Sequence, residues 1–232
     1  MKLHYLQHEE FEDLGCIRSW AESKNAHISS TKLFLNEQFP EVLDFDFLII
    51  LGGSMNVYED NIYPWLAKEK VFINDVINKD ISVLGICLGA QILSIVLGGE
   101  VTRNKYTEIG WFPVHIASIG VNIHLSSIFS NSLDVFHWHG DTFTIPINAI
   151  KIFSSDGCSN QGFIYKENVI ALQFHLETDR NSVKLLCKNC ADEIVAGKYI
   201  QDVNTITKLS SIYINNANNV MFTLLNYLVS KQ

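Results

Sequence analysis

The chain has 232 residues and a formal net charge of −8, and 47% of its residues are hydrophobic against 18% charged. Such a chain can bury a sizeable core, and its length suits a single α/β domain over residues 1–232. Its acidic balance, without any basic run, excludes nucleic acid as an expected partner.

The N-terminus and the cysteines bear on where the protein works. The chain turns acidic at Glu9, so it lacks the basic start and apolar core of a signal peptide. The five cysteines are odd in number and scattered, which argues against a disulfide framework and predicts a reducing, cytoplasmic compartment.

Residues 81–99 are uncharged and nearly long enough to cross a bilayer, but their glycines favour a strand, a turn and a helix. We therefore expect no membrane association.

In chain order, the first half alternates apolar runs of strand length with helical patterns. Strands are predicted at residues 2–7, 27–35, 45–51 and 82–87, and helices at residues 9–24, 65–78 and 89–97. The apolar run at 45–51 ends in Gly52-Gly53, as expected of a strand that is buried on both faces of a parallel sheet. This alternation predicts an α/β fold with a doubly wound, mostly parallel central sheet and flanking helices.

The second half of the chain changes character. Short strands separated by polar turns are predicted at residues 109–117, 135–139, 150–154, 162–165 and 169–175, and they are expected to form a small antiparallel edge region. Closing helices are predicted at residues 178–196 and 207–230. No repeat, low-complexity segment or linker separates these elements, which favours one domain.

The most informative segment places Cys87 in a G-x-C-x-G frame between a predicted strand and a predicted helix. The same frame with serine is the nucleophile elbow of α/β hydrolases, in which a sharp turn exposes the nucleophile. Gly85 and Gly89 keep Cβ atoms out of that crowded turn. The following helix N-terminus favours thiolate and presents the N–H of Leu88 to a developing oxyanion. A buried structural cysteine is the alternative interpretation.

A cysteine nucleophile needs a base, and the candidate lies at the end of the predicted strand 169–175. His175 and Glu177 are two residues apart, and side chains at that spacing share one face of a strand. Glu177 is therefore placed to fix the tautomer and orientation of the imidazole.

Two further patterns raise the question of a metal. His137 and His139 form an H-x-H pair, but no third ligand with convincing spacing appears, and the turn at Gly140-Asp141 favours a substrate-binding loop whose carboxylate meets an ammonium group. Cys187 and Cys190 form a C-x-x-C without a second ligand pair, which favours two cysteines one turn apart on a helix over a metal or redox pair. We therefore expect no metal and no cofactor.

Taken together, these residues resemble the class I glutamine amidotransferase family, and more narrowly its stand-alone members related to the amidotransferase domain of GMP synthase. The resemblance runs in order from about Phe45 to Glu177. It is carried by four segments, namely LGGSMNVY from Leu51, GICLGAQ from Gly85, WHGD from Trp138 and QFHLE from Gln173. Two shorter segments, YPWL from Tyr63 and EIGW from Glu108, are similar to the stand-alone members.

The resemblance implies a role for each matching position. Cys87 would attack the glutamine amide carbon, His175 would move the proton, and Glu177 would orient His175. The backbone N–H groups of Gly53 and Leu88 would form the oxyanion hole. The amino-acid end of the substrate would be held by Gln91, His139, Gly140 and Asp141.

The sequence departs from the family pattern twice, with Ser54 after the paired glycines and Leu176 between the histidine and the glutamate, where many members have proline. Both replacements alter backbone stiffness and neither removes a reacting group. The implied activity is release of ammonia from L-glutamine. Because the chain has no P-loop, the synthetase that uses the ammonia would be a separate protein. The alternatives are a hydrolase of γ-glutamyl peptides and a catalytically silent regulatory subunit.

Overall fold

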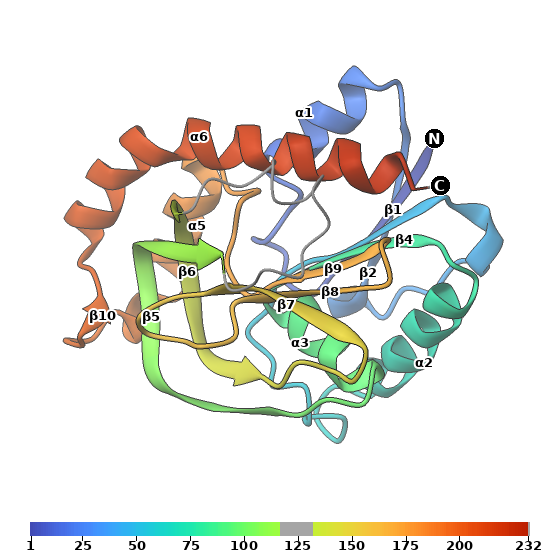
Figure 1. The fold of residues 1–232 in the computed structure, drawn as a ribbon, viewed down its shortest axis with the longest axis horizontal. Coiled ribbons are helices and arrows are strands. Elements are labelled where there is room, and N and C mark those ends of the chain that lie inside the picture. The colour runs from blue at the N-terminus through green and yellow to red at the C-terminus, as the bar shows by residue number, and fades with distance from the viewer. Residues whose placement is uncertain (117–131, 232) are drawn as a thin grey trace.

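The structure is a computed structural model that describes residues 1–116 and 132–231. Within these residues the chain forms one ten-stranded mixed sheet with helices on both faces (Figure 1). The strands lie in the order β10-β5-β7-β8-β9-β4-β3-β1-β2, and β6 pairs with β5 beside this path. The predicted fold class, an α/β protein with a mostly parallel centre and flanking helices, is confirmed.

Five parallel strands make up one side of the sheet, from its middle to the edge strand β2. They are β1 (Lys2–Gln7), β2 (His27–Lys32), β3 (Phe47–Ile50), β4 (Ser82–Ile86) and β9 (Val169–Leu172). Every residue of β3, β4 and β9 is buried, as expected of strands covered on both faces. The carboxyl ends of β4 and β9 lie side by side, because Ile86 pairs with Leu172.

The remaining strands form the antiparallel region that the sequence predicted. They are β5 (Val101–Ile116), β6 (Ser132–Phe143), β7 (Ala149–Ser154) and β8 (Gly162–Tyr165), with the two-residue strand β10 (Tyr199–Ile200) pairing in parallel with β5. Strand β9 joins the two regions, since it pairs in parallel with β4 and antiparallel with β8.

The helices cover the sheet in two layers (Figure 1). One layer holds α1 (Cys16–Ser23), α5 (Arg180–Asn189) and the long α6 (Val203–Val229), and the other holds α2 (Trp65–Asn78) and α3 (Leu88–Val96). Each layer packs on its own apolar cluster, centred on residues such as Phe174 and Met221 in the first and Leu48 and Ile73 in the second. No helix in the described part of the chain is long and apolar enough to cross a membrane.

Several predicted boundaries were wrong, two of them in the first half of the chain. The first helix begins at Cys16 instead of Glu9, because the Gln7 side chain ties the loop before it through the carbonyls of Glu9 and Glu12, both at 3.0 Å. The second strand stops at Lys32, where residues 33–35 turn into a 3₁₀ helix, and a second 3₁₀ helix covers residues 42–44.

The other differences lie in the second half. Strands β5 and β6 are longer than predicted, because they form one extended hairpin, and Ala117 of the predicted strand lies outside the described residues. Strand β9 ends at Leu172, and only an isolated bridge from His175 to Phe136 continues beyond it. Helix α5 ends at Asn189, followed by a 3₁₀ turn at residues 191–193, and β10 was not foreseen.

Candidate active site

Cys87 stands in a sharp turn between β4 and α3. Its φ of 52° lies in the left-handed region, which costs a non-glycine residue about 1–2 kcal/mol. The N–H of Cys87 donates to the carbonyl of Leu172 at 2.8 Å, and Sγ lies 3.6 Å from the carbonyl oxygen of Trp138. The strained turn predicted for the elbow is therefore present, and it lifts the thiol to the carboxyl edge of the parallel strands.

The two glycines of the frame allow this turn to pack closely. A Cβ on Gly89 would collide with the carbonyl oxygen of Ile50 and lie 2.8 Å from its carbonyl carbon. A Cβ on Gly85 would lie 2.6 Å from the carbonyl oxygen of Gly89. Because these obstacles are backbone atoms, neither position can take a side chain without moving α3 away from the sheet.

Gly89→Ala is therefore expected to destabilise the fold by about 3 kcal/mol or more, through overpacking against the β3 backbone. The matched control is Gly98→Ala, since no atom lies within 4 Å of a Cβ there and only its φ of 87° is unfavourable. That control is expected to cost about 1 kcal/mol. Urea unfolding of both variants measures the difference, and equal losses would contradict the packing account.

His175 and Glu177 follow β9 and lie together at the same sheet edge. Nδ1 of His175 is 2.6 Å from Oε1 of Glu177, and the two side chains are 2% and 7% exposed. Burial lowers the pKa of His175, but the charge of Glu177 and hydrogen bonds with Cys87 and Glu177 outweigh it, so the pKa stands well above the usual value. Residues 173–177 are not strand, so the pairing arises from the bend after β9.

A cavity of about 160 Å³ opens over Cys87. Among the residues that line it are most of those predicted from the sequence, namely Gly53, Cys87, Gln91, His139, Gly140, Asp141 and His175. Glu177 lies behind His175 and borders a smaller cavity instead. Leu88 is buried, and its side chain lies 2.9 Å from the position of a Cβ on Gly53. The structure thus brings all the predicted site residues to one region.

The loop that carries Gly53 is held by a buried pair which sequence reasoning missed. Nδ1 of His8 lies 3.0 Å from the carbonyl oxygen of Gly52, and its Nε2 lies 2.9 Å from Oε1 of Glu69. Both side chains are fully buried. Burial lowers the pKa of His8, but the charge and hydrogen bond of Glu69 raise it by more. The pair therefore fixes the glycine loop beside the elbow.

The residues expected to hold the amino-acid end are already engaged with neighbours. The amide nitrogen of Gln91 donates to Oε1 of Gln173 at 3.2 Å. The carboxylate of Asp141 accepts from Asn56 at 3.0 Å and lies 3.4 Å from an Arg103 nitrogen. Arg103 also lines the cavity, so opposite charges meet at its rim. Arg103 was not foreseen, because its place depends on the β5–β6 pairing.

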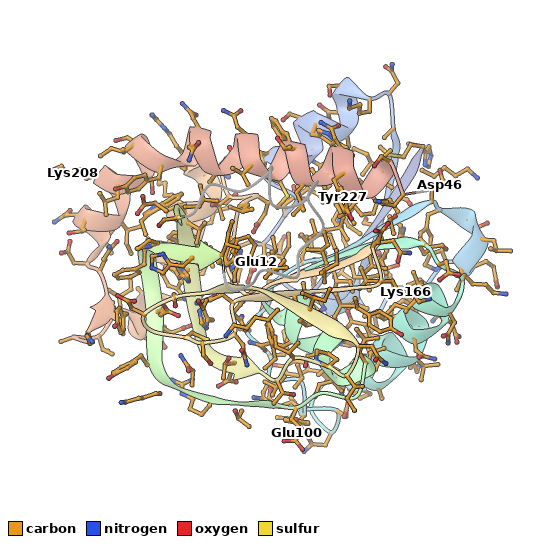
Figure 2. The ribbon with its side chains drawn as sticks, in the orientation of Figure 1. Glu12, Asp46, Glu100, Lys166, Lys208 and Tyr227 are labelled. Carbon is orange, nitrogen blue, oxygen red and sulfur yellow. The ribbon has the colours of Figure 1, made fainter. Side chains whose placement is uncertain are left out.

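Glu12 is a second acidic group beside His175. In the view of Figure 2 it lies near the centre of the molecule. Glu12 lines the cavity together with Cys87. Its carboxylate would collide with a Cβ added at Gly52, and the position of that Cβ is also 3.4 Å from Cε1 of His175. Burial, helped by the charges of Glu177 and Glu9, raises the pKa of Glu12 to about 7 despite the opposing effects of His175 and His8.

The raised pKa of Glu12 predicts a pH-dependent stability. Because the folded pKa exceeds the usual 4.5, the group favours folding below pH 4.5 and loses that contribution as the pH rises through 7. We therefore expect Glu12→Gln to have a larger free energy of unfolding than the parent. The difference between the two proteins is expected to be about 2–3 kcal/mol greater at pH 8 than at pH 5. The exposed neighbour Glu10 provides a matched control, Glu10→Gln. Parallel pH profiles of the parent and Glu12→Gln would contradict the assignment.

The other cysteines do not have the setting of Cys87. Cys187 and Cys190 are free and lie at the end of α5, which fits the interpretation as two cysteines one turn apart on a helix. Cys190 also lines the cavity, but burial, followed by the charge of Glu193, raises its pKa to about 12. Cys190 therefore stays a thiol at neutral pH and is a poor nucleophile.

Comparison with known proteins adds to this geometry. The model of the glutamine amidotransferase class-I family matches residues 18–190, a span that includes the elbow and the His175–Glu177 pair. The chain is 29% identical over 213 residues to the glutamine amidotransferase-like protein YfeJ of Salmonella typhimurium, covering 90% of this chain and 89% of that protein. It is 30% identical over 155 residues to one subunit of the glutamine-hydrolysing GMP synthase of Thermoplasma acidophilum, covering 64% of this chain and 72% of that relative.

The fold is also similar to solved structures. A glutamine amidotransferase from Thermotoga maritima superposes with a TM-score of 0.90 at 33% sequence identity, covering 99% of this chain and 98% of that one. The likeness thus extends beyond the segment that the family model matches.

Proposed function

This chain belongs to the glutamine amidotransferase class-I family, and from that premise we propose that it hydrolyses the side-chain amide of L-glutamine and supplies ammonia to an acceptor on a separate protein. The observation that carries the proposal is the cavity over Cys87. The strained, helix-capping Cys87 lines this cavity together with the buried imidazole of His175, whose Nδ1 lies 2.6 Å from Oε1 of Glu177. This is the arrangement that covalent acyl transfer needs.

The first half of the reaction forms a thioester. His175 first takes the thiol proton of Cys87, which its raised pKa favours. The thiolate sulfur then attacks the amide carbon, which forms a C–S bond and places negative charge on the oxygen. His175 then gives its proton to the amide nitrogen while the C–N bond breaks and ammonia leaves. The carboxylate of Glu177 stabilises the imidazolium throughout, because it lies against Nδ1.

The second half hydrolyses the thioester. A water molecule gives its proton to His175 as its oxygen attacks the thioester carbon. The C–S bond then breaks, glutamate leaves, and the proton returns to the sulfur. Both halves place charge on the same oxygen, for which the N–H groups of Gly53 and Leu88 are the proposed donors. Leu88 is the first residue of α3, and the first N–H groups of a helix have no partner within it.

The rim of the cavity supports an amino acid as substrate. A free amino acid carries a carboxylate and an ammonium group on one carbon. Arg103 and Asp141 offer the complementary pair of charges, 3.4 Å apart, next to Gly140. Gln91 lies deeper and is 6% exposed, so it suits the aliphatic part of the substrate or its amide. These contacts are what we propose for the binding step.

The name of one relative supports an acceptor on a separate protein. The Thermoplasma acidophilum relative is named as a subunit of its synthase. We propose a corresponding arrangement here, in which a separate synthetase takes up the ammonia.

The alternative of γ-glutamyl peptide cleavage differs from glutamine hydrolysis in its larger leaving group, which would also have to be accommodated at the cavity over Cys87. With purified protein we expect kcat/KM for L-glutamine to exceed that for γ-glutamylglycine by about tenfold or more. A coupled assay for released glutamate measures both, since each substrate yields it. A preference for the dipeptide would replace glutamine by γ-glutamyl peptides as the substrate class.

A further inference from the structure

A polar cluster lies buried under the wall of the cavity, where strands β5 and β6 pair. Glu108 is opposite His139 in the register, and Gly110 is opposite His137. The side chains of Glu108 and His139 are both 1% exposed, and Gln161 is fully buried. None of the proposed chemical steps uses Glu108 or Gln161, and buried polar groups need a reason to be there.

Glu108 is held in its charged form by its neighbours. Its Oε1 accepts from the hydroxyl of Ser155 at 2.7 Å, and its Oε2 accepts from Nε2 of Gln161 at 2.7 Å. Burial raises the pKa of Glu108, but the hydrogen bond with His139 and the nearby imidazoles of His137 and His139 lower it by more. The carboxylate is therefore a fixed negative charge inside the protein.

His139 lies between two hydrogen-bond acceptors. Its Nδ1 is 3.0 Å from the carbonyl oxygen of Asp141, and its Nε2 is 3.2 Å from Oε2 of Glu108. A third contact is Nε2 of Gln161, a donor that lies 3.3 Å from Nε2 of His139. The ring thus bridges the buried Glu108–Gln161 group and the backbone of the cavity wall, and both of its nitrogens face protein atoms.

The wall that this bridge supports faces the nucleophile. Trp138, Gly140 and Asp141 all line the cavity, and the carbonyl oxygen of Trp138 lies 3.6 Å from Sγ of Cys87. Asp141 also offers the carboxylate that meets Arg103 at the rim. A shift of His139 would therefore move Gly140 and Asp141, the groups proposed to bind substrate, while the side chains of Cys87, His175 and Glu177 keep their own contacts.

The same cluster has the composition of a metal site, and the hydrogen bonds argue against one. The ligand-type atoms of Glu108, His137 and His139 lie within 4.8 Å of one another. However, Nε2 of Gln161 already occupies their centre, 2.7 Å from Glu108, 3.3 Å from His139 and 3.5 Å from His137.

We propose that Glu108 is a positioning residue for substrate binding, which holds the ring of His139 and through it the backbone of residues 138–141. This inference rests on the proposed function for its substrate, and it gives His139 a supporting role in place of the substrate contact that the resemblance implied. Gln161 and Ser155 act with Glu108, because each donates a hydrogen bond to its carboxylate.

The test compares Glu108→Gln with the parent, and uses Glu100→Gln as the control because Glu100 is exposed near the start of the same strand. We expect the KM for L-glutamine to rise about ten- to a hundredfold in Glu108→Gln, with kcat within about threefold. The control is expected to match the parent. A fall in kcat at unchanged KM, or no change in either, would overturn the proposal.

Nitrogen-15 NMR of the histidine rings gives a readout that does not depend on activity. The ring-nitrogen signals of His139, assigned by their loss in His139→Gln, are expected to shift in Glu108→Gln and to keep their parent positions in Glu100→Gln. Unchanged His139 signals in Glu108→Gln would overturn the proposal even if glutamine is hydrolysed. A parent without glutaminase activity, together with shifted His139 signals in Glu108→Gln, would remove the proposed function and keep the bridge. Stoichiometric zinc in the purified parent, lost in His137→Asn, would replace the bridge by a metal site.

Discussion

Cys87→Ala is expected to lower the rate of ammonia release from L-glutamine by about 10⁴-fold or more, because no other group can form the thioester. The fold is expected to survive, since the change removes one sulfur atom from a side chain that is 8% exposed and leaves the backbone of the turn unchanged. Thermal unfolding measures the second expectation and an ammonia assay the first.

Cys190→Ala is the matched control for that variant. Cys190 lines the same cavity and is buried to a similar degree, but its raised pKa keeps it protonated. We expect activity within about threefold of the parent, because the change touches no reacting group. Equal losses in the two cysteine variants, or full activity in Cys87→Ala, would remove Cys87 as the proposed nucleophile.

His175→Ala is expected to lower the rate nearly as much as Cys87→Ala, whereas Glu177→Gln is expected to cost about a hundred- to a thousandfold. A histidine that moves the proton is indispensable to both halves of the reaction, but an orienting carboxylate only stabilises the imidazolium. Glu177→Gln keeps the shape of the side chain and removes its charge, which otherwise helps hold the pKa of His175 well above its usual value. Rates under saturating glutamine measure the series.

The exposed His115 serves as the control for this series, and His115→Ala is expected to match the parent. Parent-like activity in Glu177→Gln would contradict the role proposed for Glu177. A larger loss in Glu177→Gln than in His175→Ala would reverse the proposed order of the two groups.

The elbow could be predicted from the sequence because its signals are local. The apolar run of β4, the G-x-C-x-G frame and the helix behind it lie within sixteen residues, 82–97, and the structure places each boundary within one residue of its prediction. Helix α2 has its predicted bounds for the same reason, since its pattern is long and regular. His175 and Glu177 were named from a strand pattern that ends earlier than predicted, yet their pairing is found in the bend.

The supports of the site could not be predicted, because they depend on contacts between distant segments. Glu108 meets His139 only through the register of the β5–β6 hairpin, which neither strand pattern fixes. Glu12 was placed in a helix, whereas it sits in the loop that reaches His175. His8 and Glu69 meet across 61 positions of sequence. Each is an ordinary charged or polar residue until the fold brings its partner close.

The most direct test of the central claim is to identify the residue that the substrate acylates. The purified chain is mixed with L-glutamine, quenched in acid and digested, and the γ-glutamyl group is located by mass spectrometry. A glutamine-mimicking electrophile serves as a parallel probe, because its reaction needs no partner protein. We predict that both label Cys87, and that neither labels the protein in Cys87→Ala. Ammonia release without a label on Cys87, or labelling of another residue such as Cys190, would contradict the thioester mechanism.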